Sequence, residues 1–202
     1  MTPKRIAVKF FASPDPEPPV DLRPWLGLFH RFIQHKTLEG LLIDVADYAH
    51  VPEGPGVVLI GFDVDYGLDL AGGRAGLLTT SKRAQGLPLA EALRDTLRKA
   101  LLAVAAIERD GSTGLRFATG DLEIQLVDRL AAANREQAFE AARAEIAPVL
   151  ASLFDDAGPE IRRAHAEDGR KVLALAVEAK EAPAAEALLG RLGAAASGRN
   201  AR

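Results

Sequence analysis

The 202-residue chain contains no cysteine. Disulfide bonds, thiolate zinc sites, iron–sulfur clusters and cysteine nucleophiles are therefore excluded, and stability must come from packing. No apolar run approaches the roughly 18 residues that are needed to cross a bilayer. The first residues also lack the apolar segment and small-residue cleavage site of a signal peptide. We therefore expect a cytoplasmic protein that does not contact membranes.

An excess of charge of one sign is also missing. Lys and Arg number 25 against 28 Asp and Glu, which gives a formal net charge of -3. Without a basic field to hold a phosphate backbone, we expect no nucleic-acid partner. The sequence has no P-loop, dinucleotide-binding glycine motif, HExxH, GxSxG or zinc-ligand spacing. These absences count against the corresponding enzyme classes.

The first part of the chain carries clear strand and helix patterns. Apolar residues alternate with polar or small ones over Lys4–Phe11, which predicts a half-buried strand. Pro24 opens a helix whose apolar residues recur at helical spacing, and Leu41–Tyr48 predicts a second strand. The helix's apolar positions are Trp25, Leu28, Phe29, Phe32 and Ile33.

A hairpin is predicted next, with its turn near Ala71–Gly73. Its first arm reads as one strand from Val58 to Leu68. Side chains on a strand alternate between faces, so one face of this arm carries apolar residues and the other carries aspartates. The apolar face is expected to hold Val58, Ile60, Phe62, Val64, Tyr66 and Leu68, and the opposite face Asp63, Asp65 and Asp69.

The later part of the chain repeats these signals. A long helix is expected to begin after Pro88 and to end at Gly111, and a second helix to begin near Asn134. The remaining elements are two short arms over 115–117 and 122–126, a hairpin of 160–165 with 171–178 around an Asp-Gly turn, and a last helix over 183–192.

Hairpins separated by single helices predict an α+β fold: a mostly antiparallel sheet packed by about four helices. The pattern also fits two split-βαβ-like halves, although no repeat of residues supports a duplication. We expect an N-terminal α+β half over 1–110, a C-terminal βαββα half over 115–193, and a disordered tail over 194–202.

One polar cluster could form a site. Asp63 and Asp65 at i and i+2 of a strand would repel by about 0.6 kcal/mol in water and about 2.5 kcal/mol at an effective dielectric near 20. A wet sheet face with ion pairs to Arg74 or Lys82 would account for them without any function. The candidate ligand- or partner-binding residues are Asp44, Tyr48, His50, Asp63, Asp65 and Arg74.

Two functions remain open from the sequence. The first is a small binding or assembly module that holds a protein partner, or a second copy of itself, through a sheet face or edge. The second is a metal-assisted hydrolase in which Asp44, Asp63 and Asp65 bind a divalent cation and His50 acts as base, with His50 and Asp63 as catalytic candidates. No other cofactor is predicted. No two of the four histidines have the i, i+4 spacing typical of a transition-metal site on a helix.

Overall fold

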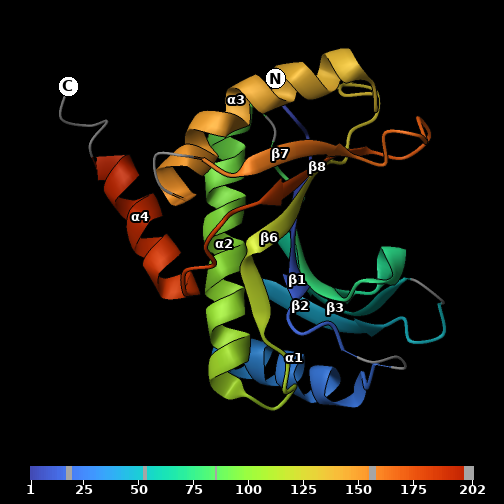
Figure 1. The fold of residues 1–202 in the computed structure, drawn as a ribbon. Coiled ribbons are helices and arrows are strands. Elements are labelled where there is room, and N and C mark those ends of the chain that lie inside the picture. Colours follow the sequence, from blue (N-terminus) through green and yellow to red (C-terminus); the bar gives the residue numbers. More distant parts are fainter. Residues whose placement is uncertain (17–19, 52–53, 85, 155–157, 198–202) are drawn as a thin grey trace.

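The computed structural model describes residues 1–16, 20–51, 54–84, 86–154 and 158–197. These residues form eight strands, four α-helices and one short 3-10 helix (Figure 1). The strands are β1 (Ile6–Ala12), β2 (Leu42–Asp47), β3 (Pro55–Gly61), β4 (Val64–Asp69), β5 (Gly76–Ser81), β6 (Phe117–Leu126), β7 (Glu160–Ala164) and β8 (Leu173–Glu178). The helices are α1 (Arg23–His35), η1 (Ala71–Gly73), α2 (Leu89–Asp110), α3 (Glu136–Phe154) and α4 (Ala185–Ser197).

All eight strands belong to one antiparallel sheet in the order β2-β3-β4-β5-β1-β6-β8-β7. The predicted α+β class with a mostly antiparallel sheet is confirmed. β1 lies inside the sheet and joins the two parts of the chain, because it pairs with β5 on one side and with β6 on the other. β2 and β7 are the two edges.

Helices α1, α2 and α3 cover one face of the sheet, and α4 packs on α2 and α3. Figure 1 shows α2 running across the sheet, with α1 near one end, α3 near the other, and α4 on the far side of α2 from the strands. α2 packs on β1 and β5, α1 on β2 and β3, and α3 on β7 and β8. The predicted burial of Trp25 is confirmed, since 1% of its surface is exposed within this core.

The two faces of the sheet differ because side chains alternate along each strand. We call the side packed against the helices the helix face and the other side the open face. On the helix face, one row of paired residues runs Leu59, Tyr66, Thr79, Val8, Ile124 and Leu175, and all six are buried. The row beside it on the open face runs Ala46, Val58, Gly67, Leu78, Lys9, Glu123, Ala176 and Arg162. Of these eight, only Gly67 and Lys9 are buried.

The predicted first arm of the hairpin is wrong. A turn at Phe62–Asp63 divides it into β3 and β4, which pair with each other. Because of this turn, the residues of β3 that face the helices are not the ones predicted. Val57 and Leu59 are buried on the helix face, whereas Phe62 is 45% exposed. The prediction failed because this turn lacks the Gly, Asn or Asp-Gly signal on which turn recognition depends. The β4–β5 hairpin with its turn at 70–75 is confirmed.

Two other details also differ from expectation. The predicted arms at 115–117 and 122–126 are replaced by the single strand β6, which Thr119 and Gly120 continue rather than interrupt. α4 extends to Ser197, so residues 194–197 of the predicted tail are helical, and 198–202 lie outside the described residues. The hairpin of β7 and β8 is confirmed.

β1 is buried along its whole length, including its open-face residues. One of these is Lys9, whose side chain is 3% exposed. Its Nζ lies 2.6 Å from Asp69 Oδ2 on β4 and also donates to the carbonyl of Ala71 in η1, at 3.2 Å. η1 and the buried Lys9–Asp69 ion pair therefore cover the centre of the open face. No α-helix among the described residues packs on this part of the open face.

We predict that replacing Lys9 with Met lowers the free energy of unfolding by about 3–5 kcal/mol, because Asp69 is left buried and unpaired. The double variant Lys9→Met/Asp69→Leu should lose much less, since no buried charge remains. Urea denaturation measures both. Arg23→Met is the control, because it removes one half of the exposed Arg23–Asp21 pair and should leave stability unchanged. Equal midpoints for Lys9→Met and Arg23→Met would contradict a structural role for the buried pair.

Candidate functional site

The structure places Asp63 and Asp65 in different settings. Asp63 lies in the β3–β4 turn, with its side chain half exposed and 3.6 Å from Arg83 Nε. Asp65 lies on the open face of β4, where Oδ1 is 2.8 Å from Lys82 Nζ and accepts the Gly61 N–H at 3.1 Å. Each carboxylate therefore has its own basic partner.

Asp44, Tyr48 and His50 lie on or just after the edge strand β2, and all three are exposed. The rings of Tyr48 and His50 are 6.3 Å apart between centroids. Arg74 lies at the other end of β4 from Asp63. It pairs with Asp121 on β6 at 2.6 Å and stacks on Phe11 with its guanidinium carbon 3.8 Å from the ring centroid. Arg74 is therefore separated from Asp63 and Asp65.

The metal hypothesis receives no positive support from this arrangement. In the described part of the chain, no three His, Asp or Glu side chains gather in a way that could hold a metal ion. A cavity of about 120 Å³ lies beside Asp63 and is also lined by Arg83, Asp95, Lys99 and Ser81. Its two carboxylates and two basic side chains balance in formal charge, and no histidine lines it.

The feature that sequence reasoning missed is an apolar area around β2. Most of the described large apolar residues with high exposure lie on β2, on its flanks or in the β3–β4 turn. We call this group the β2 patch: Leu41 (64% exposed), Ile43 (54%), Tyr48 (39%), Val51 (38%) and Phe62 (45%). Only Leu87 and Leu130 among the described residues are comparably exposed elsewhere.

The apolar area continues from the β2 patch across the open face. A bulge in β2 places Ile43 beside Asp44, and both oppose Ile60 on β3. In the neighbouring row, Val58 and Leu78 flank Gly67. Val58, Ile60 and Leu78 are half-buried, with no helix above them. The apolar area therefore reaches β5.

Acidic groups surround this area. Residues 41–51 include Asp44 and Asp47 but no Lys or Arg. Asp63 and Asp65 lie at the nearby end of β4 with their basic partners, and Arg83 stacks on Phe62 with its guanidinium carbon 3.8 Å from the ring centroid. The strand edge itself therefore carries an uncompensated negative charge.

One backbone donor at the outer side of β2 is occupied by a side chain. The Tyr48 N–H donates to the carbonyl of Gly56, so it points toward β3. Backbone N–H groups alternate in direction along a strand, and the Val45 N–H, three residues earlier, therefore points away from the sheet. That N–H donates to Asp44 Oδ1 at 2.8 Å. A carboxylate in this position occupies the donor that an added strand would need. At Val45, therefore, the β2 edge offers side chains to a partner rather than a free backbone donor.

The length of the predicted arm was the available signal for this surface. An eleven-residue strand from Val58 to Leu68 is about twice the common length of 5–6 residues. A turn inside it would have moved Val58 and Ile60 to the open face and exposed Phe62.

A search of protein-family models and a search of curated proteins find no match to this chain. Among the described residues, none of the helices has the length and apolar character needed to span a membrane.

We predict that Asp65→Asn lowers stability by about 1 kcal/mol, because it weakens a half-buried ion pair and a backbone hydrogen bond. Asp63→Asn should change stability by less than about 0.5 kcal/mol, since its ion pair is longer and solvated. Chemical denaturation of the two matched variants checks this. A loss above about 2 kcal/mol for Asp63→Asn would show that this carboxylate has a structural role absent from its contacts.

Proposed function

We propose that the protein is a binding module that holds a protein partner on the β2 patch and the adjoining apolar part of the open face. The observation that carries the proposal is the concentration of exposed large apolar side chains on one sheet edge, continuous with half-buried Val58, Ile60 and Leu78. Contiguous apolar surface rimmed by polar residues is typical of protein–protein interaction sites.

The chemistry of the surface defines the partner. Burying apolar area contributes about 25 cal/mol per Å², so Leu41, Ile43 and Phe62 would provide much of the affinity. Asp44 and Asp47 favour a partner with Lys or Arg around its own apolar residues, since complementary charges steer association. Because Asp44 blocks the outward Val45 N–H, the partner is expected to present side chains from a helix or a folded surface.

The experiment compares affinity enrichment from cell extract with the tagged wild-type protein and tagged variants. Ile43→Ser/Phe62→Ser removes two exposed apolar side chains from the β2 patch. Leu87→Ser/Leu130→Ser removes two from elsewhere and is the matched control. The proposal predicts proteins that are enriched by the wild type and the control but lost with the patch variant. Thermal melting confirms that both variants remain folded.

The recovered partner is then purified and titrated directly. We predict that Asp44→Asn/Asp47→Asn weakens binding about tenfold at low salt and that the difference shrinks as salt rises. Enrichment that is the same for the patch variant and the control would contradict the proposed site. Binding that is insensitive to salt and to the aspartates would contradict a basic partner.

A further inference from the structure

The opposite edge of the sheet, β7, also has outward backbone groups with no strand beside them in the described part of the chain. The Ala179 N–H donates to Gly120 at the end of the β8–β6 ladder. Because backbone groups alternate in direction along a strand, the N–H and C=O groups of Glu178 and Ala176 point toward β7. Those of their partners on β7, Glu160 and Arg162, therefore point toward β8. The N–H and C=O groups of Ile161, which lies between them, therefore point outward from the last strand of the sheet.

The side chains of β7 are complementary to those of a second β7 running antiparallel. If Ile161 lies opposite Ile161 of a second copy, the alternation of the ladder places Glu160 opposite the other copy's Arg162, and Arg162 opposite its Glu160. Both ion pairs lie on the open face and the two isoleucines on the helix face. Shifting the register to centre on Arg162 would instead oppose two arginines, which is destabilising.

The charges within one copy already favour this arrangement. Glu160 and Glu178 are direct neighbours across β7 and β8, as are Glu178 and Asp121 across β8 and β6. Arg162 lies 3.2 Å from Glu160 and 2.5 Å from Glu178, so one exposed guanidinium serves two carboxylates. Across the two-fold axis, each Glu160 would lie beside the other copy's Arg162 as well as its own, while the ratio of arginines to carboxylates stays the same.

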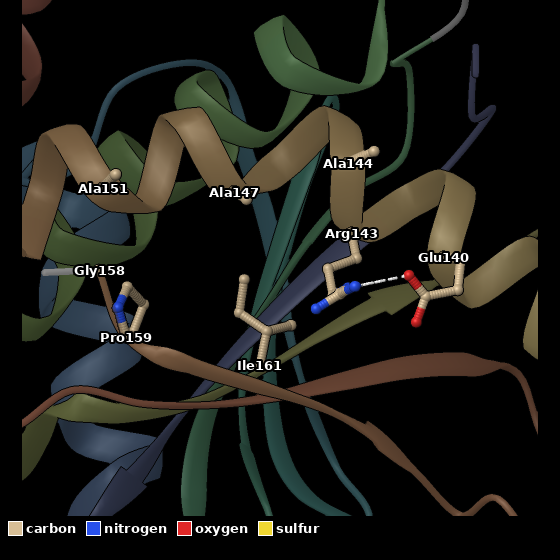
Figure 2. Close-up of a pocket in the computed structure, with 8 residues that line it drawn as sticks. All are labelled: Glu140, Arg143, Ala144, Ala147, Ala151, Gly158, Pro159 and Ile161. Carbon is tan, nitrogen blue, oxygen red and sulfur yellow. Dashed lines mark hydrogen bonds and ion pairs between the residues drawn. The ribbon is translucent and has the colours of Figure 1, made fainter.

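There is also room for the apolar contact. A cavity of about 460 Å³ lies between α3 and the start of β7. Figure 2 shows Ile161 pointing from β7 toward α3, with Ala147 above it and Arg143 beside it. The α3 residues that line the cavity are Glu140, Arg143, Ala144, Ala147 and Ala151. A second isoleucine beside the first would lie at the border of this cavity.

We propose that two copies of the chain associate through antiparallel pairing of their β7 strands, with Ile161 at the two-fold axis. The two eight-stranded sheets then form one continuous sheet, and β2 remains at each outer end. A two-fold interface of this kind is isologous, so each Glu160–Arg162 contact occurs twice. The inference concerns the edge opposite the β2 patch and does not depend on the proposed partner.

Sedimentation equilibrium tests the charge pairing. The wild type is expected to show a monomer–dimer equilibrium. Arg162→Glu should weaken the dimer at least about tenfold, because it opposes Glu160 with a second carboxylate. The swap Glu160→Arg/Arg162→Glu should restore it, since the pairs are only exchanged. Arg23→Glu, an exposed charge reversal elsewhere, is the control. A wild type that stays monomeric up to its solubility limit, or a dimer that Arg162→Glu leaves intact, would overturn the proposal.

The absence of cysteine allows a direct test of the register. In Ile161→Cys, the only thiols of two paired copies would face each other with Cα atoms about 5.5 Å apart, which suits a disulfide. Mild oxidation should give a disulfide-linked dimer. Ile43→Cys carries its thiol on the other edge and should form no disulfide-linked dimer. Equal cross-linking of the two variants, or none for Ile161→Cys, would overturn the pairing.

Discussion

The fold depends on one constraint: in the part of the chain that the structure describes, α-helices cover only one face of the eight-stranded sheet (Figure 1). The helix face is filled by apolar side chains, and its burial provides the core. The open face must be stabilised without such a layer. At its centre, β1 is buried on both faces, and Lys9 bridges to Asp69 and to the carbonyl of Ala71. These contacts of Lys9 hold η1 over the open face, and they link β1 to the end of β4.

The open face is consequently divided. On the β2 side of Lys9 it is apolar, with Ile60, Val58 and Leu78 half-buried. On the β7 side, the acidic groups of β6, β8 and β7 are compensated by Arg74 and Arg162. A surface with one apolar part and one charged part can contact different partners at its two ends. This division underlies both proposals.

Much of the fold could be predicted from the sequence, because periodicity is a local property. The stripe of Trp25 and Phe29 identified α1, and the Asp-Gly turn identified the hairpin of β7 and β8. The turn at Phe62–Asp63 could not be recognised, since this pair is not the Asn-Gly or Asp-Gly of a two-residue hairpin turn and is held there by pairing of β3 with β4. Because this turn was missed, Phe62 was predicted to lie in the core, and the exposed apolar surface around β2 was not predicted.

The candidate residues were predicted less well than the fold. Asp44 lies on β2 near the β3–β4 turn that carries Asp63, whereas Tyr48 and His50 follow the other end of β2, beside the part of β3 that pairs with the Asp69 end of β4. Arg74 follows that same end of β4. Sequence spacing gives the face of a residue within one strand, but the order of strands decides which residues meet. That order depends on β1 pairing with both β5 and β6, which are distant in the chain.

The central claim is that the two edges of the sheet behave differently: on β2 the outward N–H of Val45 is occupied by Asp44, and β7 is open to an added strand at Ile161. Residue-resolved amide hydrogen exchange at low and high protein concentration tests this most directly, because an added strand protects outward N–H groups. The account predicts that the amide of Ile161 becomes protected as concentration rises, while that of Val45 does not change. Concentration-dependent protection at Val45, or none at Ile161, would contradict it.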